Sequence, residues 1–334
     1  MLINWRQSKG ARKMKNFDDL PEQIIDIKDK PRPATDFLND YYQSLGNGES
    51  ELLGISTGFK ALDKATLGLD GLIVLGGIAG QGKTSLALQL ACNACDTGTP
   101  TIFYSLEMPR RAILTKLLNR IAKVKYSDIL LKGKKYLTKD ETGQAEQTGQ
   151  DRKLLSEREA ENLKAGKEAL KAIGTEFYIR SRERGEAEIN FTIVEQEIEY
   201  LKALHSKQRI LVVIDHLQVF NVDDYKDQID KEGKLITGFK VITERTGATI
   251  VLISQKNKQG FTSKGLQTLK GSVDIVYLAD VVMTLESKQE TEGNNIYDNQ
   301  TKEIDLIIQK NRYNAPTTIK LELNGEYSEF TEKN

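Results

Sequence analysis

The chain has 334 residues, with 48 basic and 48 acidic side chains, a net charge near zero and 39% hydrophobic residues. This length and apolar content allow one large folded domain with a smaller element, and they exclude a mostly disordered chain. No apolar run approaches the ~20 residues of a membrane helix, and the basic N-terminus lacks the apolar core of a secretory signal, so we expect a cytoplasmic protein without a membrane partner.

Residues 1–50 are predicted to form a short helical arm or linker. An amphipathic helix is expected over Leu20–Ile27, and a second over Thr35–Leu45 that ends at Gly46. The segment has too few apolar residues for a core of its own. An arm that cannot bury its apolar stripe usually docks on another surface, such as a neighbouring subunit.

Residues 51–334 are predicted to form one α/β domain. Short apolar runs alternate with longer helical stretches, which is typical of a mostly parallel sheet covered by helices on both faces. The predicted strands are Leu72–Gly76, Thr101–Leu106, Ile210–Ile214, Thr249–Ile253 and Val281–Leu285, with Glu303–Gln309 and Thr317–Leu323 as an antiparallel extension. The predicted helices are Ser85–Asp96, Pro109–Lys123, Phe191–Leu204 and Gln228–Arg245. Residues 132–161 are polar and predict an exposed insertion that becomes helical towards its end.

A phosphate-binding loop is predicted at Gly77–Thr84, which fits the pattern G-x-x-x-x-G-K-[ST] between an apolar strand and an amphipathic helix. Glycines allow several backbone N–H groups to face one anion, and the helix N-terminus directs its positive end at the same phosphates. Lys83 adds a charge for the β- and γ-phosphates, and Thr84 offers a hydroxyl ligand to Mg²⁺. A glycine-rich turn without a ligand is the alternative. The residues assigned to the nucleotide site are Gly77, Gly80, Gln81, Gly82, Lys83, Thr84 and Ser85.

Three further candidates end predicted strands. Asp215 follows a buried strand and suits an outer Mg²⁺ ligand, whereas Glu107 could activate the attacking water as a general base. Gln255 could bind the γ-phosphate and report the state of the nucleotide to the loop that follows it. Each of the three could instead be an ordinary polar residue at a strand or helix end.

Six motifs follow one another along the chain: Gly77–Thr84, Ser105–Met108, Val213–Gln218, Ile253–Gln255, Ala279–Met283 and Lys310–Arg312. In this order they resemble the motor domain of DnaB-type replicative helicases and, more loosely, phage and mitochondrial primase-helicases. The resemblance covers roughly Leu52–Phe330. It implies a RecA-like P-loop NTPase core, a hexameric ring of identical subunits, ATP and Mg²⁺ at subunit interfaces and single-stranded DNA in the central channel.

The resemblance also implies a role for each matching residue. Lys83 and Thr84 would hold phosphate and Mg²⁺, with Asp215 assisting the metal. Glu107 would activate water, and Gln255 would couple hydrolysis to DNA. Lys310 and Arg312 would act on the γ-phosphate of a neighbouring subunit, where an Arg stabilises the charge of the transition state. A basic, solvated strand end is the alternative for this pair.

A basic, glycine-containing stretch after Gln255 is predicted to contact nucleic acid. The neutral net charge excludes a uniformly basic coat, but it allows binding through local loops. Lysines and backbone N–H groups would contact phosphates without regard to sequence, although a solvated surface loop is the alternative. The predicted DNA contacts are Lys256, Lys258, Lys264, Lys270, Gly271 and Ser272.

The predicted function is an ATP-dependent helicase motor that moves along single-stranded DNA, in the 5′ to 3′ direction by analogy with the family. A primase or a helicase loader is a candidate partner, although residues 1–50 do not match the family's separate N-terminal helical domain. His216 stands where the family more often has Tyr, and we expect it to pack or to form hydrogen bonds. The alternatives are another RecA-like ATPase, of the recombinase or clock type, and a nucleotide-binding ring adaptor or loader.

Overall fold

The computed structural model divides the chain into two compact units, Met1–Glu51 and Leu52–Asn334. In the first unit, helix α2 spans Thr35–Gly46, as the sequence predicts, and its Phe37 and Tyr42 side chains are exposed. The other predicted arm helix lies outside the described residues. Described are residues 33–46, 52–131, 155–183, 188–207, 209–255, 277–287 and 301–333.

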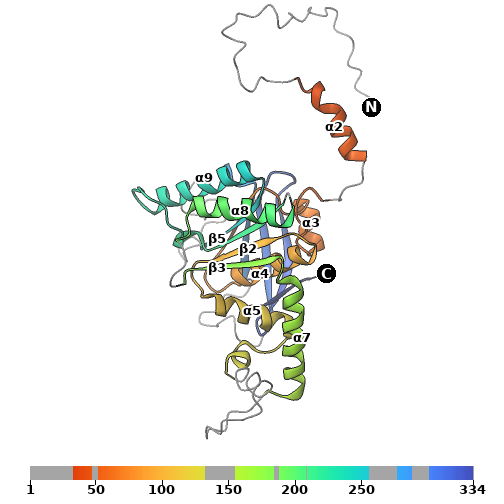
Figure 1. Cartoon of the computed structure of the whole chain (residues 1–334), viewed down its shortest axis with the longest axis vertical. Coiled ribbons are helices and arrows are strands. Elements are labelled where there is room, and N and C mark those ends of the chain that lie inside the picture. The colour runs from red at the N-terminus through yellow and green to blue at the C-terminus, as the bar shows by residue number, and fades with distance from the viewer. Residues whose placement is uncertain are drawn as a thin grey trace, which may run out of the picture. The chain divides into compact units, whose positions relative to one another are not determined.

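The second unit is built on a sheet in the order β3-β2-β4-β5-β1-β6-β7-β8-β9 (Figure 1). Neighbouring strands from β3 to β6 pair in parallel, and β7, β8 and β9 extend the sheet in antiparallel fashion. The predicted parallel core and antiparallel extension are therefore confirmed. The strands are β1 Leu72–Gly77, β2 Thr101–Ser105, β3 Phe177–Ser181, β4 Leu211–Asp215, β5 Thr249–Gln255, β6 Val281–Ser287, β7 Thr301–Asn311, β8 Thr317–Asn324 and β9 Glu329–Glu332.

Helices cover both faces of the parallel part, which explains why its strands are apolar throughout. Along β1, Ile73 and Leu75 pack in the core cluster on the α4 and α5 face, whereas Leu72 and Val74 pack in the cluster on the α8 and α9 face. Figure 1 shows the two helical layers. The helices of this unit are α3 Lys60–Thr66, α4 Lys83–Asp96, α5 Arg110–Ala122, α7 Glu157–Ile173, α8 Phe191–His205 and α9 Gln228–Thr246. None of the helices within the described ranges has the length and apolar character needed to cross a membrane.

The starts of α7 and α9 follow the local capping chemistry. Ser156 and Glu159 form a reciprocal capping box that starts α7, and the side chain of Asp227 accepts a hydrogen bond from the backbone N–H of Asp230 to start α9. The predicted helical end of the polar insertion is confirmed by the first residues of α7. That helix extends to Ile173, well beyond the predicted insertion, and residues 132–154 lie outside the described part of the chain.

The two outermost strands were not predicted. β3 is an edge strand with partly exposed central residues, so it lacks the continuous apolar run that marks β1 or β4. β9 is only four residues long. The side chain of Gln89 in α4 holds β9 in place, because its Nε2 donates to the carbonyl of Phe330 and its Oε1 accepts from the N–H of the same residue, both at 2.8 Å.

Candidate nucleotide site

The phosphate-loop motif forms a tight turn between β1 and α4. Gly80 and Gly82 have φ angles of 88° and 86°, which L-residues with a side chain rarely adopt. A Cβ atom on Gly82 would also lie 2.9 Å from the ring of Phe330, so the loop needs glycine there for space as well. Within the turn, the N–H of Ile78 donates to the side-chain oxygen of Gln81 at 3.0 Å. The backbone is therefore curled as an anion-binding loop requires.

Lys83 is the first residue of α4 and lies folded inside this loop. Its Nζ donates to the carbonyl oxygens of Gly77 and Ile78 at 2.9 and 2.8 Å. Burial lowers the pKa of the ammonium to about 8, whereas the charges of Asp215 and Glu107 act in the opposite direction. The ammonium is held in the loop by weak carbonyl acceptors, which a phosphate oxygen can replace with a stronger, charged one.

The carboxyl ends of β2 and β4 place two carboxylates beside the loop. Ser105 pairs with Asp215 in the parallel register, and Glu107 follows two residues beyond Ser105. Asp215 is 4% exposed, and burial raises the pKa of its carboxyl to about 6, although a hydrogen bond from Thr84 opposes the shift. The two predicted Mg²⁺ ligands are thus in direct contact.

Glu107 lies at the open side of the site. Its side chain is 67% exposed, and its Oε2 lies 3.2 Å from Nδ1 of His216. Burial lowers the pKa of His216, whereas the charge of Glu107 acts in the opposite direction. A ring that carries a proton on Nδ1 can donate it to the carboxylate. His216 thereby makes the kind of contact expected of a hydrogen-bonding residue at this position, and it constrains the side chain assigned to the general base.

Gln255 ends β5 next to β1, since it pairs with Gly77 in the parallel register. Its backbone N–H donates to Oε1 of Gln218 at 3.3 Å, and Nε2 of Gln218 donates to the hydroxyl of Ser254 at 3.0 Å. Lys231 of α9 binds the carbonyl of Gln218 at 3.0 Å. Gln218 belongs to the Asp-x-Leu-Gln motif, but no role was predicted for it; the structure shows that it fixes the end of the strand assigned to sensing.

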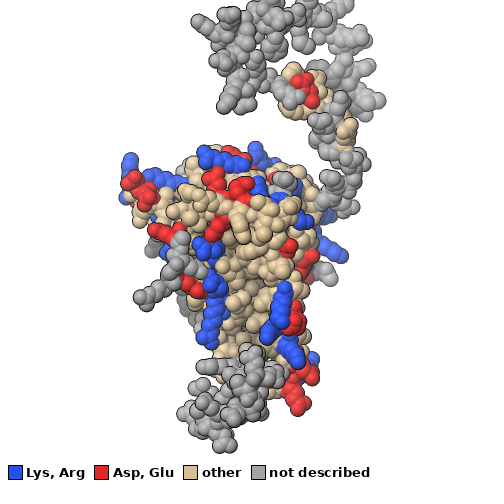
Figure 2. Space-filling model, in the orientation of Figure 1, with Lys and Arg blue, Asp and Glu red and all other residues tan. Residues whose placement is uncertain are grey.

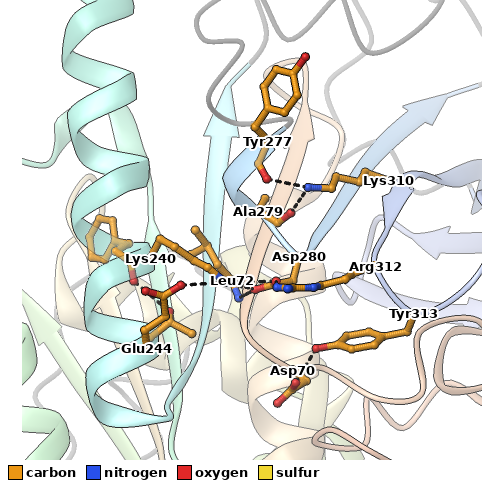
Figure 3. Close-up of polar contacts among 12 residues, drawn as sticks. Asp70, Leu72, Lys240, Glu244, Tyr277, Ala279, Asp280, Lys310, Arg312 and Tyr313 are labelled. Carbon is orange, nitrogen blue, oxygen red and sulfur yellow. Dashed lines mark hydrogen bonds and ion pairs between the residues drawn. The ribbon is translucent and has the colours of Figure 1, made fainter. Parts of the chain in front are cut away.

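The predicted trans-acting cations lie at the other end of the sheet. Lys310 in β7 donates to the carbonyls of Tyr277 and Ala279 at 3.0 and 2.6 Å, and Nη1 of Arg312 binds Oδ1 of Asp280 at 2.7 Å (Figure 3). Asp280 in turn accepts the N–H of Leu72, the first residue of β1, whereas the phosphate loop begins at Gly77. At 3.3 Å per residue the two ends of β1 are roughly 17 Å apart, beyond the reach of one side chain. The structure therefore does not bring Lys310 and Arg312 together with the phosphate loop of the same chain.

The predicted DNA-contact residues, Lys256, Lys258, Lys264, Lys270, Gly271 and Ser272, lie outside the described residues. On the face of the larger unit drawn in Figure 2, the described Lys and Arg side chains lie interspersed with Asp and Glu side chains. This face is not a continuous basic surface.

The residues at the phosphate loop fit a magnesium nucleotide. Within the described ranges, the protein has no group of three or more His, Cys, Asp or Glu side chains that could hold a metal ion by themselves. Mg²⁺ in phosphate-loop sites is held by few protein ligands together with phosphate oxygens. Thr84 and the buried Asp215, in contact with each other beside Lys83, match that donor set.

Comparisons with known proteins identify the family of the chain. The family model described as "DnaB-like helicase C terminal domain" matches residues 54–332. "Replicative DNA helicase DnaB" of Leifsonia xyli is 26% identical over 304 residues, which cover 88% of the chain and 59% of that protein. The protein of the same description from Haemophilus influenzae is 25% identical, with coverage of 96% and 63%. The chain thus spans about three fifths of the length of these curated relatives.

Two solved structures have the same fold. One, described as an "ATPase Domain", superposes with a TM-score of 0.74 at 18% identity, covering 91% of the chain and all of that structure. "The Structure Of A DnaB-Like Replicative Helicase And Its Interactions With Primase" gives the same TM-score and identity, covering 90% of the chain and 69% of that structure. The expected RecA-like α/β class is confirmed.

Proposed function

The chain belongs to the DnaB-like helicase C-terminal domain family, and on this premise we propose that it is an ATP-driven DNA helicase motor working as a ring of identical subunits. One observation carries the proposal. The phosphate loop and its carboxylates lie at one end of β1, and the cations needed to complete the site lie at the other end. A ring places the second end of one subunit against the first end of the next.

ATP would bind with its phosphates in the loop between β1 and α4. The backbone N–H groups of the loop and the start of α4 would face the phosphates, and Lys83 would exchange its two carbonyl acceptors for phosphate oxygens. The bound Mg²⁺ would neutralise phosphate charge, with Thr84 and Asp215 holding it. Gly77, Gly80, Gln81, Gly82 and Ser85 would form the remaining wall of the site.

Hydrolysis would depend on Glu107 as the general base. Its exposed carboxylate can accept the proton of an attacking water, and the contact with Nδ1 of His216 limits the orientations that it can adopt. The charge that develops on the transferring phosphoryl group would be met by Lys83 from the same subunit and by Arg312 and Lys310 from the neighbour.

Movement along DNA would begin at the end of β5. Gln255 lies beside the phosphate loop, and Gln218 links its backbone to Ser254 and α9. A change in the contact of Gln255 with nucleotide would be passed to the lysine-containing residues 256–272, which we assign to phosphates of single-stranded DNA. The family implies a hexamer and 5′ to 3′ movement. A primase or a helicase loader remains the candidate protein partner.

The decisive test has two parts. The first is ATP turnover of the purified protein with and without single-stranded DNA. The second is unwinding of forked duplexes in which either the 5′ tail or the 3′ tail is blocked. We expect DNA-stimulated hydrolysis and unwinding of forks whose 5′ tail is free. With nucleotide present, light scattering should give the molar mass of a ring of several subunits. Lys83→Ala should abolish hydrolysis, because the ammonium of Lys83 is the charged group of the loop that would bind the phosphates.

Other outcomes would overturn the proposal. Nucleotide-dependent assembly without turnover would indicate an adaptor or loader, and strand exchange without fork unwinding would indicate a recombinase. A monomer in the presence of both nucleotide and oligonucleotide would exclude the shared site. DNA-stimulated turnover in Lys83→Ala would contradict the assignment of the phosphate loop.

A further inference from the structure

Asp280 is a buried carboxylate that holds two cations from different elements. Its side chain is 4% exposed. Its Oδ2 accepts the N–H of Leu72 at 2.8 Å and the ammonium of Lys240, from α9, at 2.9 Å. Its Oδ1 accepts Nη1 of Arg312 at 2.7 Å. Figure 3 shows the carboxylate between the two cations, at the point where β1 and β6 begin.

The position is shaped for this carboxylate. A Cβ atom on Gly71 would lie 2.2 Å from Oδ2 of Asp280, so a side chain there would displace it. The backbone of Asp280 is tied on both sides, since its N–H donates to the carbonyl of Leu72 and its carbonyl accepts the N–H of Arg312. Burial by itself would raise the pKa of Asp280, but the N–H of Leu72 and the two cations bring it below its ordinary value. The carboxylate is therefore charged and fixed to the sheet.

Arg312 is held by this carboxylate without being buried. Its side chain is 64% exposed, whereas that of Lys240 is 15% exposed. A guanidinium has five N–H donors in a planar fork, and the contact with Oδ1 uses Nη1. The rest of the fork stays accessible to an anion approaching from outside the subunit. A free Arg side chain on a strand end would instead sample many rotamers, with a large entropy cost for each binding event.

We propose that Asp280 is the positioning residue for Arg312, holding its guanidinium in the orientation that reaches the nucleotide of the neighbouring subunit. This inference rests on the proposed function, in which Arg312 acts in trans. Lys240 has the supporting role, because it keeps the carboxylate neutralised and in place when Arg312 shares its charge with a phosphate. Asp280 itself contacts no nucleotide.

Asp280→Asn tests the proposal, because the amide keeps the size of the side chain and removes the charge. Misplacing a catalytic group by about 1 Å can lower a rate by about 10²-fold, so we expect a fall of that order in kcat. The KM for ATP should stay near that of the wild type, since Lys83 and Thr84 are unchanged.

Mixed rings separate positioning in trans from a structural defect in the same subunit. Asp280→Asn subunits are mixed with an excess of Lys83→Ala subunits, which cannot hydrolyse ATP but supply Arg312 held by an intact Asp280. Turnover for each Asp280→Asn subunit should rise to the level of wild-type subunits mixed in the same proportion. Arg312→Ala subunits mixed with Lys83→Ala subunits are the matched control and should be rescued equally.

The outcomes are distinguishable from failure of the proposed function. If Arg312→Ala subunits are rescued but Asp280→Asn subunits are not, Asp280 acts within its own subunit and the inference is wrong. Wild-type turnover in Asp280→Asn rings would also overturn it. Should Asp280→Asn fail to fold, Asp280→Glu keeps the charge but moves the carboxylate by one methylene, and it is expected to show the same loss and rescue. If Arg312→Ala subunits are not rescued either, Arg312 does not act in trans, and the proposed function is refuted instead.

Discussion

The two ends of β1 carry opposite arrangements of charge. At Gly77, the ammonium of Lys83 is bound to two backbone carbonyls within the loop, with the buried Asp215 nearby. At Leu72, the carboxylate of Asp280 is bound to two cations and a backbone N–H. In the proposed function, the donors of the first end would bind an anion that comes from outside the chain. At the second end, the carboxylate of Asp280 already has its hydrogen-bond donors, and the guanidinium of Arg312 is exposed.

The difference shows why one chain cannot complete the proposed site alone. Moving a cation from one end of the strand to the other would require unfolding the sheet, because both ends are fixed by the same parallel pairing. Two copies of the chain can bring the ends together without any such change. The asymmetry of a single strand is therefore a physical reason for a head-to-tail ring.

Removing Arg312 takes away the cation that the second end of β1 would supply, and this should have the largest effect. Arg312→Ala leaves the phosphate loop intact, so ATP binding is expected to stay near that of the wild type. Turnover should fall about 10³-fold or more, as for an arginine supplied in trans to other triphosphatases. Measuring nucleotide affinity and steady-state hydrolysis on the same variant checks both expectations, unchanged binding and reduced turnover. Arg245→Ala removes an Arg of similar exposure, 67%, on α9 and serves as the control. Wild-type turnover in Arg312→Ala would exclude the trans role.

Substitution of Glu107 tests the phosphate-loop end. Glu107→Gln keeps the size of the side chain and its contact with His216 but cannot accept a proton. Turnover should therefore fall by about 10²- to 10⁴-fold with little change in ATP binding. Single-turnover hydrolysis with preloaded ATP measures the chemical step by itself. Glu199→Gln, at a side chain on α8 that is 56% exposed, is the control. If hydrolysis persists at the wild-type rate, the general base lies elsewhere.

Local sequence patterns were enough to predict the phosphate-loop end of the molecule. Its strands are continuous apolar runs, which local hydrophobicity reveals. Its loop has the fixed glycine and lysine spacing of a phosphate-binding motif. The second end was only partly predictable. Lys310 and Arg312 were identified by resemblance, but Asp280, which binds Arg312, is 32 positions away from it in sequence. Lys240, which binds the same carboxylate, is on α9. Pairings between such distant residues depend on the tertiary structure and leave no local spacing to detect.

The edge strand β9 also could not be predicted from local sequence. β9 has only four residues, and it is fixed by the two hydrogen bonds from Gln89 in α4 rather than by a pattern of its own. Gln89 lies among apolar residues of a helix, where the sequence predicts core packing. A hydrogen bond between one buried polar side chain and a distant backbone group cannot be predicted until the positions of both elements are known.

Loss of Gln89 should weaken the packing of β9 against α4, next to the phosphate loop. Gln89→Ala leaves the N–H and carbonyl of Phe330 without their partner in a buried position, and this should lower the free energy of unfolding by roughly 1–3 kcal/mol. Phe330 packs against Gly82, so nucleotide affinity should fall as well. Urea unfolding measures the first effect. Glu168→Ala, which breaks an exposed pair with Lys171, should cost under about 1 kcal/mol. Equal stability of the two variants would contradict the prediction.

The smallest expected effect is at the opposite end, where the hydroxyl of Tyr313 donates to Asp70 at 2.8 Å. Burial and this hydrogen bond raise the pKa of Tyr313 to about 12, above its ordinary value of about 10. The folded state therefore favours the neutral phenol. Its contribution to stability is complete below about pH 10 and is lost as the pH rises through about 12.

Tyr313→Phe should accordingly lower the free energy of unfolding by about 1 kcal/mol at pH 8, since partial exposure screens the interaction. The gap between variant and wild type should shrink between pH 10 and 12, when urea unfolding is measured across that range. Tyr200→Phe, at a side chain on α8 that is 63% exposed, is the control and should show no gap at either pH. A gap for Tyr313→Phe that widens with pH would mean that the folded state stabilises the phenolate, and the charge balance inferred around Asp70 and Asp280 would then be wrong.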